Sequence, residues 1–135
     1  MIAAMAVFFS FPVIYLIIVR SSAATAVPPP APTQESEIAN IENISIQHPS
    51  PANFLNLSLV YYRAKRFGDC IEAAQKAIAL KPDFAAAYNN ICAANNDIGN
   101  FAEGKKAGEE AVRLDPANQL YKNNLKWSID ELNKK

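Results

Sequence analysis

A repeat with a period of 34 residues constrains this chain more than any other feature of its sequence. Residues 85–118 align with residues 51–84 when one stretch is shifted by 34 positions. Aromatic, small and proline residues match between the copies: Phe54 with Tyr88, Ser58 with Cys92, Phe67 with Phe101, Ala77 with Ala111, and Pro82 with Pro116. A third, incomplete copy begins at Gln119. A period of roughly 20–50 residues is typical of folds built from stacked structural repeats.

Each full copy is predicted to form two antiparallel helices. Apolar residues recur every three or four positions in both halves of each copy, as they do along one face of a helix. Each copy ends near a proline, which cannot continue a helix, and the short turn between the halves makes the two helices antiparallel. Residues 119–135 are predicted to form a closing helix, with an apolar stripe made by Tyr121, Leu125, Ile129 and Leu132.

These residues resemble the tetratricopeptide repeat family. The resemblance covers residues 51–118 as two full units and residues 119–132 as a terminal helix. It implies an all-α fold: a short array of helical hairpins in which small residues let helices approach and aromatic residues fill the wedge between successive pairs. The expected domain is 51–135, with repeats at 51–84 and 85–118 and a capping helix at 119–135.

The second copy departs from this pattern at three positions. Asn95 stands where the first copy has Tyr61, so an aromatic residue is lost from the wedge. Gly104 and Gly108 lie inside a predicted helix, where each glycine costs about 0.5–1 kcal/mol relative to alanine. We therefore expect the second copy to be the less well packed and the domain to have marginal stability.

The resemblance implies a binding function. Tetratricopeptide repeats bind peptides or protein segments along a concave face made by the first helix of each hairpin. Asn56, Asn90 and Asn124 recur on this face at intervals of 34, and a side-chain amide can both donate to and accept from a peptide backbone. The alternative is that these amides serve local hydrogen bonding or helix packing. The candidate peptide-binding residues are Asn56, Asn90, Asn124, Tyr62, Arg63, Asn89, Asn96 and Trp127.

Trp127 lies on the same predicted helix as Asn124 and has two interpretations. It either contacts a partner or is partly buried at the edge of the cap.

A second binding pattern of the family can be compared with these positions. Chaperone-binding members of the family clamp a peptide carboxylate with lysine, asparagine and arginine. Asn90 fits that pattern, but the other clamp positions hold Leu55, Leu59, Leu120 and Asn124. We therefore expect no carboxylate clamp and no chaperone tail as the partner.

The sequence gives no sign of catalysis or of a cofactor. The 13 basic and 13 acidic residues balance, so nothing favours nucleic acid as a partner. His48 is the one histidine, and no glycine-rich phosphate loop is present, so we expect no enzyme activity, no metal and no cofactor. Cys70 and Cys92 are expected to be small buried residues. The alternative is a disulfide in an oxidising compartment.

Residues 1–20 are predicted to be a transmembrane helix or a signal segment. Ile2–Val19 is 18 residues long without a charge, and as a helix it would extend about 27 Å, close to the thickness of a bilayer core. A retained helix predicts a single-pass membrane protein, whose orientation the lone Arg20 does not determine. A cleaved signal predicts a secreted or periplasmic protein, and a buried soluble helix is the third alternative.

Residues 21–50 are predicted to be a Pro-rich, mostly disordered linker, because proline-rich spacers are extended and stiff. The leading hypothesis is a membrane-tethered protein–protein interaction module that binds a protein or extended peptide. The alternative is the C-terminal membrane helix and repeat tail of a larger multi-span membrane enzyme, such as a glycosyltransferase.

Overall fold

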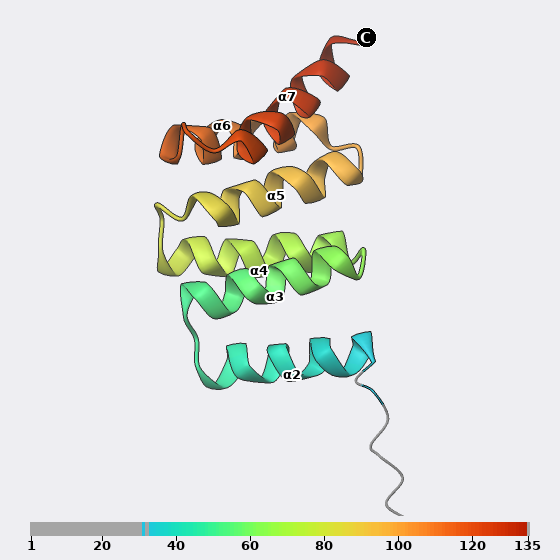
Figure 1. Ribbon diagram of the computed structural model, residues 1–135, viewed down its shortest axis with the longest axis vertical. Coiled ribbons are helices and arrows are strands. Elements are labelled where there is room, and N and C mark those ends of the chain that lie inside the picture. The colour runs from blue at the N-terminus through green and yellow to red at the C-terminus, as the bar shows by residue number, and fades with distance from the viewer. Residues whose placement is uncertain (1–30, 32, 135) are drawn as a thin grey trace, which may run out of the picture. The chain divides into compact units, whose positions relative to one another are not determined.

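The structure is a computed structural model that describes residue 31 and residues 33–134. This part of the chain folds into six helices, and its successive helices run in alternating directions (Figure 1). They are α2 (Gln34–Gln47), α3 (Pro51–Arg63), α4 (Phe67–Leu80), α5 (Ala85–Asp97), α6 (Phe101–Leu114) and α7 (Gln119–Asn133).

The predicted all-α repeat array is confirmed. α3 pairs with α4 and α5 pairs with α6, and α7 packs against the second hairpin. Ser50 caps α3, where its hydroxyl accepts from the Asn53 amide at 3.1 Å, and Pro51 occupies the first turn. Asn118 caps α7 in the same way, since its side-chain oxygen accepts from the Leu120 amide at 3.1 Å. Both helices therefore begin at a residue whose side chain satisfies a free backbone amide of the first turn.

The turn inside each hairpin uses a left-handed residue at the same repeat position. Lys65 has a φ of 59° and Gly99 a φ of 80°, and the two residues are 34 positions apart. Glycine adopts this conformation readily, whereas lysine does so at a cost. The hairpin geometry is thus conserved between the copies even though the turn residue is not.

The prediction of a mostly disordered linker at residues 21–50 is wrong for residues 34–47, which form α2. Thr33 caps this helix, because its hydroxyl accepts from the Ser36 amide at 3.2 Å. Ile38 is only 2% exposed and belongs to the same core cluster as Leu57 and Tyr61. The helix is stabilised mainly by packing on α3, which residues 34–47 alone do not reveal.

The expectation of a poorly packed second copy fails at its two glycines. Gly104 and Gly108 are both buried in α6. A Cβ on Gly104 would lie 2.5 Å from Asn96 Oδ1, and a Cβ on Gly108 would lie 3.0 Å from Cys92 Sγ. The absence of a side chain is therefore what lets α6 approach α5 and α7 closely.

The segment predicted as a transmembrane or signal helix, residues 1–20, lies outside the described residues. None of the helices within the described part of the chain has the length and apolar character needed to cross a bilayer.

Candidate functional site

An open pocket of about 390 Å³ is formed by residues of α3, α5 and α7, the first helices of their repeats, and by Phe84, which directly precedes α5. We call it the α3–α5–α7 groove. Its lining residues are Ala52, Leu55, Asn56, Leu59, Phe84, Ala86, Asn89, Asn90, Leu120 and Tyr121. Three of these, Asn56, Asn89 and Asn90, belong to the predicted peptide-binding set.

The described lining of the α3–α5–α7 groove contains no charged residue. Leu59 and Leu120 are 37% and 57% exposed, and both line the same pocket, so their apolar surface is grouped rather than scattered. Together with Leu55 they make the groove apolar along both walls, while amide side chains supply its polar groups. Such a surface can bury an apolar segment and satisfy its backbone through amides.

The asparagines of the predicted ladder tie neighbouring helices together. Asn90 donates from Nδ2 to Ser58 Oγ at 2.7 Å, which joins α5 to α3. Asn124 donates from Nδ2 to Asn89 Oδ1 at 2.8 Å, which joins α7 to α5. Asn56 is exposed at the groove. Two of the three rungs thus serve helix packing, and their role in peptide binding stays a prediction.

Comparison with known proteins supports the repeat interpretation. The chain is 34% identical over 79 residues to the Hsp70-Hsp90 organizing protein of Triticum aestivum, an alignment that covers 56% of this chain and 14% of that protein. The first repeat domain of Spaghetti (RPAP3), solved bound to the HSP90 peptide SRMEEVD, superposes with a TM-score of 0.70 at 25% identity and covers 74% of this chain and 80% of that one.

A second solved structure agrees. The tetratricopeptide domain of Sgt2 from Aspergillus fumigatus superposes with a TM-score of 0.68 at 17% identity, over 90% of this chain and 77% of that one. The helical array is a tetratricopeptide repeat fold. No protein-family model matches the chain. The chain spans only a small part, 13–14%, of the wheat relative and of heat shock protein STI1 from Saccharomyces cerevisiae.

Other members of the predicted binding set lie outside the groove lining of this tetratricopeptide fold. The Tyr62 hydroxyl donates to Asp97 Oδ2 at 2.5 Å, and the Tyr62 ring packs edge-on against Phe67. Burial, together with the hydrogen bond to Asp97, raises the pKa of Tyr62 to about 12. Arg63 and Trp127 are exposed. None of these three residues is part of the α3–α5–α7 groove lining.

Asn96 is buried rather than presented to a ligand. It is 2% exposed, donates from Nδ2 to the Asn124 carbonyl at 2.9 Å, and accepts at Oδ1 from Ser128 Oγ at 2.6 Å. These bonds hold Asn96 between α5 and α7, and its role in peptide binding stays a prediction. Cys92 lies beside it as a free, fully buried thiol, and burial raises its pKa.

Both cysteines match the expectation of small buried residues. Cys70 is free and fully buried, and burial raises its pKa to about 12. A thiol held protonated in this way is a poor nucleophile, so neither cysteine has the character of a reactive group. Within the described residues, no cluster of His, Cys, Asp or Glu could hold a metal ion.

Sequence reasoning missed the apolar residues of the groove as a set. Phe84, Ala86 and Tyr121 line it beside the leucines, and of these three only Tyr121 belongs to a predicted stripe, the apolar stripe of the closing helix. The useful signal is at the clamp positions, where leucines replace polar residues. An apolar residue that faces outward at a binding position indicates an apolar ligand.

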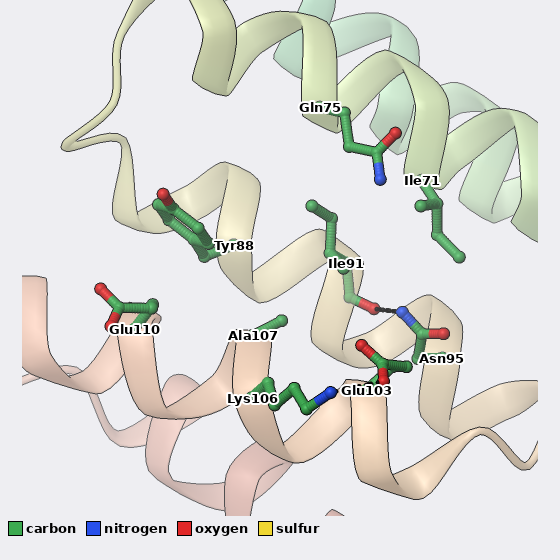
Figure 2. Close-up of a pocket in the computed structure, with 9 residues that line it drawn as sticks. All are labelled: Ile71, Gln75, Tyr88, Ile91, Asn95, Glu103, Lys106, Ala107 and Glu110. Carbon is green, nitrogen blue, oxygen red and sulfur yellow. Dashed lines mark hydrogen bonds and ion pairs between the residues drawn. The ribbon is translucent and has the colours of Figure 1, made fainter.

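A second open pocket, of about 430 Å³, is formed by α4, α5 and α6 (Figure 2). We call it the α4–α5–α6 pocket. It is lined by Ile71 and Gln75 of α4, by Tyr88, Ile91 and Asn95 of α5, and by Glu103, Lys106, Ala107 and Glu110 of α6. It shares no lining residue with the α3–α5–α7 groove.

Proposed function

We propose that this chain is a protein-interaction module that binds an extended, uncharged and largely apolar segment of a partner protein in the α3–α5–α7 groove. The observation that carries the proposal is the lining itself: three leucines, aromatic and alanine side chains, and asparagine amides, with no charge among them. Burying the apolar side chains of a partner there would contribute about 25 cal/mol per Å².

The groove chemistry favours such a segment over an acidic tail. The peptide bound by the Spaghetti domain, SRMEEVD, carries three carboxylate side chains. A carboxylate placed in the groove here would meet Leu55, Leu59 and Leu120 and would lose its hydration without gaining a cation. The same fold therefore supports a different ligand chemistry in this chain.

We further propose that the module, whose mechanism is binding rather than catalysis, has a membrane anchor. The proposed anchor is the segment of residues 2–19. The 18 uncharged residues of that stretch support the tether. Resistance of the full chain to alkaline carbonate extraction from membranes is the expected result, and quantitative release into the soluble fraction would contradict it.

The binding proposal is tested with the full chain on an array of short capped peptides that vary in charge and apolar content. We expect binding to concentrate on uncharged peptides rich in Leu, Ile, Val or Phe. The double variant Leu59→Gln with Leu120→Gln should weaken that binding about tenfold, because it removes the two most exposed leucines of the groove.

The matched control is Leu80→Gln, which changes a leucine that is 51% exposed on α4 and lies outside the groove lining. It should leave binding unchanged. Equal losses in the control and in the double variant would contradict the site, and the absence of binding to every peptide class would contradict the function.

A further inference from the structure

The α4–α5–α6 pocket has a filled counterpart one repeat earlier in the chain. α2 and α4 each have 14 residues, and α2 begins and ends 33 positions before α4. α2 is therefore the second helix of an incomplete preceding repeat, and the space between α2, α3 and α4 corresponds to the space between α4, α5 and α6. The two spaces can be compared residue by residue.

Three apolar residues of the earlier space have apolar counterparts in the later one. Ile38 of α2 corresponds to Ile71 of α4, Leu57 of α3 to Ile91 of α5, and Ala73 of α4 to Ala107 of α6. The earlier members of these pairs all belong to one core cluster, and the later members all line the α4–α5–α6 pocket.

The earlier space is filled by an aromatic ring. Tyr61 is 9% exposed, its hydroxyl donates to the carboxylate of Glu42 on α2, and the Arg66 guanidinium lies 4.6 Å from its ring centroid. These contacts close the space between α2, α3 and α4 with a phenol side chain.

The later space lacks that ring. The residue 34 positions after Tyr61 is Asn95, a much smaller side chain, and its amide turns back to donate to the Ile91 carbonyl at 2.9 Å (Figure 2). Gln75 occupies the place that Glu42 has in the earlier repeat, and its side chain lines the pocket. An amide oxygen at this place can accept a hydrogen bond from a hydroxyl.

We propose that the α4–α5–α6 pocket is a receptor for a tyrosine side chain of a partner protein, which takes the place that Tyr61 fills in the preceding repeat. The ring packs on Ile71, Ile91 and Ala107, and its hydroxyl donates to Gln75. This site lies apart from the α3–α5–α7 groove, so it gives the module a second point of contact and does not depend on the proposed function of the groove.

The rim of the pocket is compatible with this ligand. Glu103 accepts from Lys106 at 2.7 Å, and Glu110 is paired with Arg113 at 2.8 Å, so both carboxylates of the lining are already neutralised by neighbours on α6. A neutral phenol therefore meets no unpaired charge among these residues on entering.

The test titrates p-cresol, the analogue of a tyrosine side chain, into the isotope-labelled full chain and follows backbone amide signals by NMR. We expect saturable shifts at Ile91, Asn95 and Ala107, with a dissociation constant in the range of about 1 mM that is typical of such a small probe.

The variant Asn95→Tyr should fill the pocket from within. It should abolish the p-cresol shifts and raise the denaturation midpoint, because the new ring adopts the packing of Tyr61. Asn123→Tyr adds the same side chain at an exposed position on α7 and should change neither quantity. Ala107→Leu narrows the pocket from α6 and should also abolish the shifts, which keeps the test valid if Asn95→Tyr does not fold.

Three outcomes would overturn the proposal. One is a lack of saturable shifts at the pocket in the wild-type chain. Another is p-cresol binding that survives both filling variants. The third is concentration-dependent self-association that Asn95→Tyr and Trp127→Ala each abolish, because the occupant would then be the exposed Trp127 of a second copy rather than a partner's tyrosine.

Discussion

The effect of Gly104 on stability in an isolated helix differs from its effect in α6, which is packed between α5 and α7. By helix propensity alone, replacing this glycine with alanine would stabilise α6. In the structure the new methyl group would lie 2.5 Å from Asn96 Oδ1 and 3.1 Å from Ser128 Oγ. Those two atoms are hydrogen-bonded to one another at 2.6 Å, so neither can move without breaking a buried bond.

We therefore predict that Gly104→Ala destabilises the fold by about 1–3 kcal/mol, the usual cost of overpacking. Gly68→Ala is the matched control, because Gly68 is also helical and has no neighbouring atom within 4 Å of an added Cβ. It should be neutral or stabilise by up to about 1 kcal/mol. Urea denaturation of the three chains measures both changes, and a Gly104→Ala chain as stable as wild type would contradict the close packing of α6.

Residue types at fixed repeat positions explain what could be predicted from the sequence at this scale. Pro82 and Pro116 mark the hairpin ends, and Asn118 marks the start of α7 as a cap. The burial of Asn96 could not be predicted, because asparagine is usually a surface residue, whereas here its amide bonds to Ser128 and to the Asn124 carbonyl of another helix. Partners of a buried amide come from the tertiary fold and leave no local pattern.

At the scale of elements, α2 is the helix that sequence periodicity did not predict. Its apolar residues do not form a clean stripe, because Ser45 takes one buried position and Ile44 and Ile46 point outward. A signal does exist in the repeat register: Pro49 precedes Pro82 by 33 positions, as α2 precedes α4. The period therefore extends further toward the N-terminus than the matching side chains do.

The docking of α2 can be measured with two isoleucines of the same helix. Ile38→Ala removes a side chain that is 2% exposed in the core and should destabilise the fold by about 2–5 kcal/mol. Ile46→Ala removes one that is 71% exposed and should change stability by less than about 0.5 kcal/mol. Equal effects in a chemical denaturation series would mean that α2 is not part of the cooperative unit.

At the scale of the whole molecule, the stacked helices form two separate open pockets. The first helices form the α3–α5–α7 groove, and the neighbours α4, α5 and α6 form a separate pocket. The fold class could be predicted from the 34-residue period because stacked repeats allow few arrangements. The binding surface could be predicted only in part. Leucines are usually expected in the core and asparagines on the surface, whereas here leucines are exposed at the groove and several asparagines are buried.

The central claim is that the charge-free lining of the α3–α5–α7 groove selects its ligand. The most direct measurement compares the affinity of the wild-type full chain and of the double variant Leu55→Lys with Leu120→Lys for the acidic peptide SRMEEVD and for the best uncharged peptide of the array. We predict that the wild type prefers the uncharged peptide. The double variant should no longer bind the uncharged peptide. Its affinity for SRMEEVD should be about tenfold or more higher than that of the wild type, because two cations then line the groove. A wild-type chain that binds SRMEEVD more tightly than any uncharged peptide would contradict the account.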